Sequence, residues 1–189
     1  TIPSQDRNFV IEDGLPSLVP PFQLPWLPST VDSAGPVLPL SEGGTLVNTR
    51  LPTAGFAYFV ADGTTLSRGW ETSAPSPVPG LYFSSSAERF LSRHNDGSYL
   101  VMLPLTASPP NGAASRYLFR YDPPSTFTLL MPPSVVIGTT TAYLSDFAET
   151  SPAGDFLVAD VSNGLVTNHS GSWEWIARHG DPIPGLSGV

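Results

Sequence analysis

The amino-acid sequence predicts an all-β protein, an antiparallel β-sandwich or β-barrel of short strands with at most one or two short helices. Three observations predict this fold class. The 22 prolines among 189 residues divide the chain into pieces too short for ordinary helices. Three Asp-Gly or Asn-Gly dipeptides each separate two runs of β-forming residues, as in tight hairpins. Pro-Pro pairs recur near every tenth residue between further strand candidates, which is typical of sandwiches and barrels.

The first 40 residues are the most biased part of the chain. Seven prolines between Pro16 and Pro39 alternate with apolar residues that include Phe22 and Trp26. This pattern predicts an extended segment that packs its aromatic side chains on the domain, and a stiff hinge is an equal alternative. We therefore divide the chain into a proline-rich N-terminal segment (1–40), an antiparallel β-domain (41–180) and a C-terminal tail (181–189).

Strands and turns follow one another through the β-domain. Hairpins are predicted around Asp62-Gly63, Asp96-Gly97 and Asn163-Gly164, with type I′ turns because these dipeptides supply positive φ. The further predicted strands are Thr45–Leu51, Leu81–Ser84, Arg116–Tyr121, Thr126–Met131, Val135–Thr141 and Trp173–His179. In the third of these, alternation places Phe119 and Tyr121 on one face and Leu118 on the other. Short helices are candidates at 84–89, from a capping-box pattern, and at 141–150.

Composition excludes several classes of function. The chain has no lysine, which excludes Schiff-base chemistry and P-loop phosphate binding. It has no cysteine, which excludes disulfides, thiol catalysis and Cys-ligated zinc. A net charge of −8, with no arginine cluster larger than two, disfavours nucleic acid and anionic membranes as partners. No apolar run approaches the roughly 18 residues of a membrane span. Because the chain begins at Thr1, we expect a piece of a longer protein.

The histidines indicate no catalytic site. His94, Asp96 and Ser98 could form a Ser/His/Asp triad, but many such combinations occur by chance in a serine-rich chain. A second combination uses His169, Asp155 and Ser170, and there is no Gly-x-Ser-x-Gly elbow. We therefore expect turn histidines and no enzyme, and we keep a small Asp/His/Ser-type hydrolase as an alternative.

Metal binding has only a weak sequence signal. Acidic residues near predicted turns offer oxygen ligands for Ca²⁺, although no dense Asp-x-Asp-x-Asp loop is present. We expect no cofactor, with Ca²⁺ as the alternative. The residues concerned are Asp62, Asp96, Asp122, Asp146 and Asp155. The triplet Asn168-His169-Ser170 is a glycosylation sequon that matters only in a secretory pathway.

Aromatic residues are the candidates for ligand contact. We expect the four tryptophans to fill the core (Trp26, Trp70, Trp173 and Trp175). We expect Tyr82, Phe83 and Tyr143 to be exposed loop aromatics that contact a receptor or glycan.

Three parts of the chain together resemble the protruding domain of a small non-enveloped positive-strand RNA virus capsid protein, of the nodavirus, tetravirus or sinaivirus kind. These parts are the proline-rich stretch Leu15–Pro39, the short-strand domain from Thr45 to His179, and the Pro/Gly-rich stretch Gly180–Gly185. In such capsids the RNA-neutralising charge lies in a basic N-terminal arm, which fits the missing lysine. The resemblance implies a virion-surface location, association with other capsid subunits as a homo-oligomer, and in some members bound Ca²⁺.

Three functions follow as hypotheses. The first is a structural capsid spike for host-cell attachment and subunit association. The second is a secreted or surface carbohydrate-binding β-domain, and the third is the hydrolase. A basic arm and a jelly-roll shell upstream in the parent gene would distinguish the first hypothesis from the second.

Overall fold

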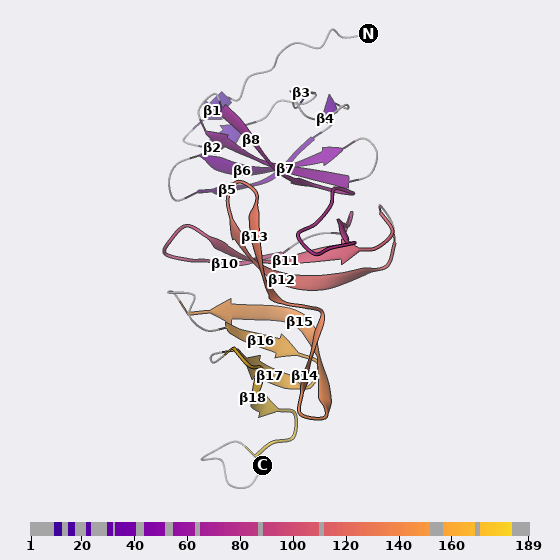
Figure 1. Ribbon diagram of the computed structural model, residues 1–189. Helices are drawn as coiled ribbons and strands as arrows, with labels where there is room; N and C mark the ends of the chain where they lie inside the picture. The colour runs from indigo at the N-terminus through magenta and orange to yellow at the C-terminus, as the bar shows by residue number, and fades with distance from the viewer. Residues whose placement is uncertain are drawn as a thin grey trace.

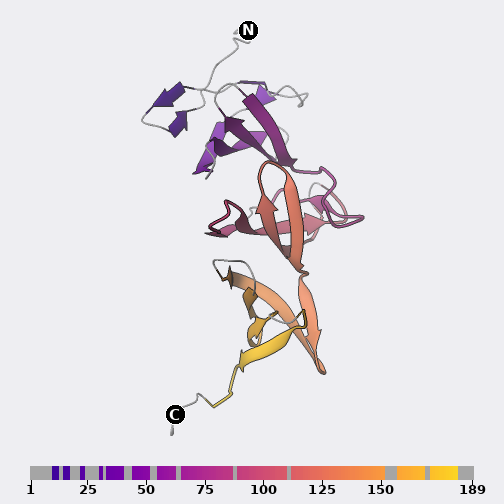
Figure 2. The ribbon, with the colours of Figure 1, turned by 60° about the vertical axis from the view of Figure 1, so that its left-hand side comes forward.

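The computed structural model describes residues 10–12, 15–17, 22–23, 30–31, 33–40, 44–51, 55–62, 65–86, 89–109, 112–151, 157–168 and 171–182. In these ranges the chain forms strands, turns and irregular segments, and no helix. The predicted all-β class is therefore confirmed. Three antiparallel sheets follow one another along the long axis of the molecule (Figures 1 and 2).

The first sheet, which we call the N-terminal sheet, contains four strands in chain order: β5 (Ser33–Pro39), β6 (Thr45–Leu51), β7 (Gly55–Asp62) and β8 (Thr65–Glu71). Two small strand pairs precede it, β1 (Val10–Glu12) with β2 (Leu15–Ser17) and β3 (Phe22–Gln23) with β4 (Thr30–Val31). They lie next to the N-terminal sheet at the N-terminal end of the stack (Figure 1), where β4 contacts β6 and β2 contacts β5.

The middle sheet runs in the order β10 (Arg89–Arg93), β11 (Tyr99–Thr106), β12 (Ala114–Asp122) and β13 (Thr126–Met131), and the short β9 (Tyr82–Phe83) also pairs with β11. The C-terminal sheet also follows chain order. It contains β14 (Ser134–Ile137), β15 (Thr140–Thr150), β16 (Leu157–Val161), β17 (Gly164–Thr167) and β18 (Glu174–Arg178).

Strand β11 lies at the centre of the stack, and all eight of its residues are buried. Val101 and Leu103 belong to a core shared with Leu46 and Trp70 of the N-terminal sheet. Met102 faces the other way, into a core shared with the C-terminal sheet. A strand covered on both faces is apolar along most of its length, as β11 is up to Thr106, because successive side chains point to opposite sides. The middle sheet is therefore the central layer of three.

Strand β12 confirms the predicted alternation. Phe119 and Tyr121 lie in the core shared with the N-terminal sheet, and Leu118 lies in the core shared with the C-terminal sheet. The far face of the N-terminal sheet is also buried, since Val47 and Phe59 are inaccessible although they point away from the middle sheet. The strand β5 pairs with β6, so the end of the proline-rich segment is part of this sheet. Trp26 lies outside the described residues.

The predicted hairpin pairings are confirmed, but the turn type is wrong at two of them. Type I′ needs positive φ at both central residues, and in these two turns only Gly97 (φ 86°) and Gly164 (φ 144°) have it. The β10–β11 turn is a wider loop closed by hydrogen bonds from the His94 amide to the Ser98 carbonyl and from the Gly97 amide to the His94 carbonyl. Gly63, in the third turn, lies outside the described residues.

Two local predictions are corrected. The short helix considered at 141–150 is part of β15, because burying Ala142 and Ala148 against the core of the C-terminal sheet requires an extended strand. The strand predicted over 135–141 is interrupted by the β14–β15 turn at Gly138 (φ 64°). The other helix candidate, 84–89, is irregular over Ser84–Ser86, and its residues 87 and 88 lie outside the described residues.

Candidate functional site

An open cavity of about 380 Å³ lies between the edge of the N-terminal sheet and the middle sheet. We call it the β8–β13 cavity. Its volume is within the range of small-molecule sites, which is roughly 300–1,000 Å³. The lining residues come from β8, from the loop between β8 and β9, from β9 and from the β12–β13 hairpin: Arg68, Gly69, Trp70, Ala74, Pro75, Ser76, Pro77, Phe83, Ser125 and Phe127.

The aromatic side of this cavity is held by the packing of Trp70. The indole stacks on Tyr58, with ring centroids 4.0 Å apart and an interplanar angle of 7°. It meets Tyr121 and Phe127 edge to face, at 5.0 and 5.3 Å. Trp70 is only 6% exposed, which confirms the expectation that it is a core residue. The cavity therefore has a fixed aromatic wall rather than an exposed indole platform.

The tip of the β12–β13 hairpin closes one side of the cavity. The Tyr121 hydroxyl donates a hydrogen bond to the carbonyl of Pro124, 2.7 Å away, and burial raises the pKa of this phenol. The tip also approaches Gly69, where an added Cβ would lie 3.2 Å from the Pro124 oxygen and 2.7 Å from the Tyr58 oxygen. Glycine at position 69 thus allows the hairpin and β7 to come close to β8.

The opposite wall is a loop tied to β9 by backbone hydrogen bonds. The Ser73 amide donates to the Phe83 carbonyl, and the Phe83 amide donates to the Ala74 carbonyl. Ser76 is fixed within the loop, because its hydroxyl donates to the Val78 carbonyl and accepts from the Val78 amide, both at 3.1 Å. These bonds present Pro75 and Pro77 to the cavity in a defined conformation.

Arg68 is the one ionisable residue that lines the β8–β13 cavity within the described part of the chain. Its side chain is 52% exposed and forms an ion pair with Glu71, three residues further along β8. Glu71 does not line the cavity, and its side chain is 16% exposed. The cavity therefore combines apolar walls with one cation and the hydroxyls of Ser76 and Ser125.

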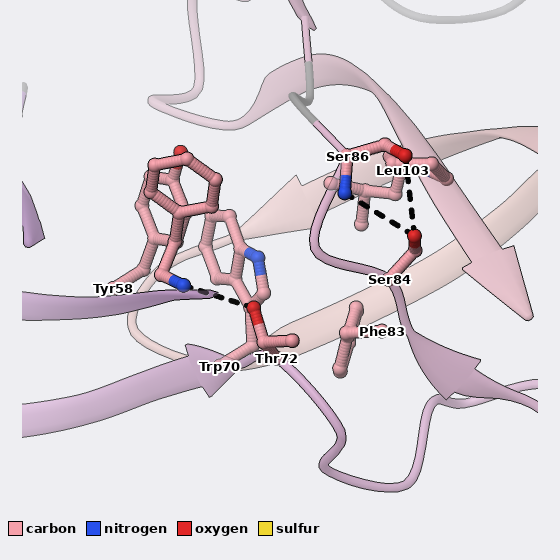
Figure 3. Close-up of a pocket in the computed structure, with 9 residues that line it drawn as sticks. Tyr58, Trp70, Thr72, Phe83, Ser84, Ser86 and Leu103 are labelled. Atoms are coloured by element: carbon pink, nitrogen blue, oxygen red, sulfur yellow. Dashed lines mark hydrogen bonds between the residues drawn. The ribbon is translucent and has the colours of Figure 1, made fainter. Parts of the chain in front are cut away.

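A second hollow lies on the other side of Trp70 and Phe83 but holds only about 10 Å³, roughly the space of one water molecule. Figure 3 shows its polar side, formed by Thr72, Ser84 and Ser86. Thr72 accepts a hydrogen bond from the Phe56 amide, and Ser84 bonds to Ser86. Because these groups are already paired and the space is small, this hollow belongs to the packing of the two sheets.

His94, Asp96 and Ser98, one of the triads that can be drawn from the sequence, do come together at the β10–β11 turn. The Ser98 hydroxyl donates to an Asp96 oxygen at 2.7 Å, and His94 Nδ1 lies 2.8 Å from the same hydroxyl oxygen. Since the serine proton is directed to Asp96, Nδ1 must carry the proton that joins it to Ser98. His94 is thus a donor to Ser98, whereas a catalytic histidine accepts the serine proton.

This polar chain extends at both ends. Thr150 of β15 hydrogen-bonds His94 Nε2, so the chain joins the middle and C-terminal sheets. At the other end Arg120 bonds Asp96 at 2.7 Å and Asp122 at 3.0 Å. Burial lowers the pKa of His94, which favours the neutral ring, and the hydrogen bonds from Ser98 lower the pKa of Asp96. His94 and Ser98 are 6% and 1% exposed, whereas Asp96 and Arg120 lie at the surface, so the part of this hydrogen-bond network that joins the two sheets is its buried end.

The predicted contact residues do not form one site. Phe83 is 6% exposed and lies on β9, so the expectation of an exposed loop aromatic is wrong there. Tyr82 is half-buried beside it. Tyr143 is 58% exposed, but it lies on β15 of the C-terminal sheet. Of the other tryptophans, Trp173 and Trp175 are half-buried against the core of the C-terminal sheet.

The acidic residues considered for Ca²⁺ are dispersed. Asp96 and Asp122 both bind Arg120. In the described ranges no group of three or more His, Asp or Glu side chains is placed to hold a metal ion. The side chains of Asp62 and Asp146, and the whole of Asp155, lie outside what the structure describes, as do His169 and Ser170 of the second triad and sequon.

Sequence reasoning missed Arg68, Ser125 and Phe127 as members of one site. They lie up to 59 positions apart and meet only because the β12–β13 hairpin folds onto β8. A comparison of the chain with protein-family models, curated proteins and solved structures finds no match. Within the described ranges, no helix is long and apolar enough to cross a bilayer.

Proposed function

We propose that this chain is a non-catalytic attachment module whose β8–β13 cavity binds a sugar ring of a host receptor or glycan. The single observation that carries the proposal is the cavity itself, which is open, apolar along its walls and supplied with a few polar groups. That combination is typical of small-molecule binding sites. A capsid protruding domain would use such a cavity at the virion surface, and a carbohydrate-binding β-domain would use it in the same way.

The walls of the cavity match both the apolar C–H face of a sugar ring and its hydroxyl groups. Phe127, Phe83 and the prolines offer apolar contact to the C–H face of the ring. Ser76 keeps a free lone pair beyond its two bonds with Val78, so it can accept a hydrogen bond from a sugar hydroxyl. Ser125, at the exposed hairpin tip, can donate or accept on the other side.

Filling the cavity should weaken ligand binding without unfolding the protein. We expect Ser125→Trp to weaken binding at least tenfold in a glycan-array or calorimetric titration, because the indole occupies space that the ligand needs. Ser115→Trp is the matched control, since Ser115 is an exposed serine on the same hairpin that does not line the cavity. Equal binding by both variants, with unchanged melting temperatures, would show that the ligand binds elsewhere.

A second function, association of subunits, is favoured by the outer face of the C-terminal sheet. Five of the six large hydrophobic residues that are exposed in the described part of the chain lie on this sheet: Val136, Tyr143, Phe147, Leu165 and Ile176. Each is adjacent in sequence to a residue that belongs to, or packs against, the core shared by the middle and C-terminal sheets, so their side chains point away from that core. We propose that a second copy of the chain packs on this face. Sheets within the molecule already pack face to face, and the outer face of the C-terminal sheet is the free end of that stack.

Oligomeric state tests this association. We expect the chain to dimerise at high concentration in sedimentation experiments and Phe147→Glu to shift it to monomer, because a carboxylate would be buried in the contact. Leu129→Glu, a similarly exposed position on β13 outside this face, should leave the dimer intact. The exposed Glu149 and Glu174 would repel their copies across the contact. Because salt screens this repulsion, we expect the dimer to be tighter at higher salt. A parent chain that stays monomeric at all concentrations would refute the proposal.

A further inference from the structure

We infer that the sugar bound in the β8–β13 cavity carries a carboxylate, which Arg68 recognises. This inference rests on the proposed function and names the ligand class of the same site. Its basis is the charge distribution of the lining: Arg68 is ionisable, and the other nine lining residues are apolar or hydroxyl-bearing. Within the described residues Arg68 is the one cation at the cavity, so a carboxylate on the bound sugar meets an opposite charge there although the chain as a whole carries a net charge of −8.

The arrangement of Arg68 leaves it able to bind a ligand. Its bond to Glu71 runs from Nη2 to Oε1, and a guanidinium has five N–H donors in a planar fork. The side chain is about half exposed, so donors remain accessible from the cavity. Glu71 orients the guanidinium from outside the cavity lining, which is the position of a supporting residue rather than a competing ligand. The fork can then donate hydrogen bonds to both oxygens of a carboxylate.

The positions of the other groups set the orientation of the ligand. Arg68 and Ser125 come from different sheets and both line the cavity, with the rings of Trp70 and Phe127 between β8 and the hairpin. A sugar ring lying against Phe127 would direct its carboxylate to Arg68 and its hydroxyls to Ser76 and Ser125. A carboxylate on the ring would thus accept from the Arg68 donors that the bond to Glu71 leaves over, and the sugar hydroxyls would pair with the serine hydroxyls.

Matched pairs of ligands separate this inference from the function on which it rests. The full chain is titrated calorimetrically with methyl glucuronide, methyl galacturonide and methyl sialoside, and with the methyl ester of each, which keeps the shape and removes the charge. We expect at least one acid to bind tenfold or more tightly than its ester. Equal binding of acid and ester overturns the inference while the sugar-binding function stands. No binding of any acid or ester refutes the sugar-binding function as well.

Variants assign the preference to Arg68. We expect Arg68→Gln to reduce the ratio of acid to ester affinity to about one, and Arg68→Lys to retain part of it. Arg93→Gln is the control, because Arg93 is an exposed arginine on β10 outside the cavity. The melting temperature of each variant confirms that it is folded. An Arg68→Gln protein that keeps the full preference would show that another residue reads the carboxylate.

Discussion

Replacing Trp70 with alanine is expected to lower the free energy of unfolding by about 3–5 kcal/mol, the usual cost of removing a large buried aromatic residue. The side chain is 6% exposed and contacts five other aromatic rings, which come from both the N-terminal and the middle sheet: Tyr58, Phe83, Phe90, Tyr121 and Phe127. Its removal leaves a cavity that neither sheet can close alone, because the backbone of each sheet is fixed by its strand ladder.

Chemical denaturation monitored by circular dichroism measures this loss. Trp173→Ala provides a matched comparison, since Trp173 is half-buried against the other core and should cost less. Trp70→Phe should recover part of the stability, because it keeps an aromatic ring in the cluster. A loss for Trp70→Ala no greater than that for Trp173→Ala would contradict the central role of Trp70 in the core shared by the N-terminal and middle sheets.

Replacing His94 with alanine is expected to cost about 1–3 kcal/mol at pH 8, because it removes the ring partner of the half-buried Thr150 hydroxyl and one of the two partners of the buried Ser98 hydroxyl. The same substitution should also remove a pH dependence. Burial lowers the pKa of His94 below its ordinary value of about 6.5, so the folded protein holds fewer protons on this ring than the unfolded chain. The stability from the neutral ring is therefore complete above pH 6.5 and declines as the pH falls through that value.

The charged groups around His94 set the strength of this effect. Burial lowers the pKa of His94, and Arg120 lowers it further. Asp96 and Asp122 raise this pKa, but by less than the other two effects lower it. Unfolding curves between pH 8 and pH 5 should show declining stability in the parent chain and a flatter profile in His94→Ala. His179→Ala is the control, since His179 is exposed. Parallel profiles for the parent and His94→Ala would show that the ring is not the titrating group. At lower pH, protonation of Asp96 removes a further contribution, because its folded-state pKa is also lowered.

Strand positions and faces could be predicted from local pattern. Thr45–Leu51 and Thr126–Met131 match β6 and β13 at both ends. The continuous burial of β11 was not foreseen, because a run such as Tyr99–Thr106 reads as apolar without showing that two sheets cover it. The segment 141–150 was ambiguous for the same reason. Its apolar residues suit a short helix until the neighbouring strands β14 and β16 make extended pairing favourable.

The candidate site could not be predicted, since its members are chemically ordinary taken singly. Phe83 was chosen for its aromatic ring, and the structure places that ring in the core, where it also lines the cavity. Arg68 belongs to no recognisable sequence motif. It shares the cavity with Ser125 only because the β12–β13 hairpin, more than fifty residues further along the chain, folds onto β8. In contrast, His94, Asp96 and Ser98 are close in sequence, so their meeting was foreseeable, but the direction of their hydrogen bonds was not.

The sequence by itself determined the class of fold, the faces of the strands and the kinds of chemistry that are excluded. Proline density and alternation constrain the backbone locally, and the missing residue types exclude chemistry whatever the fold. Only the tertiary structure decided that three sheets stack in layers, which aromatic residues are buried, and where a cavity opens with an arginine at its edge. The physical reason is that burial and cavities depend on which surfaces meet. In this chain those surfaces come from hairpins whose stacking no local pattern records.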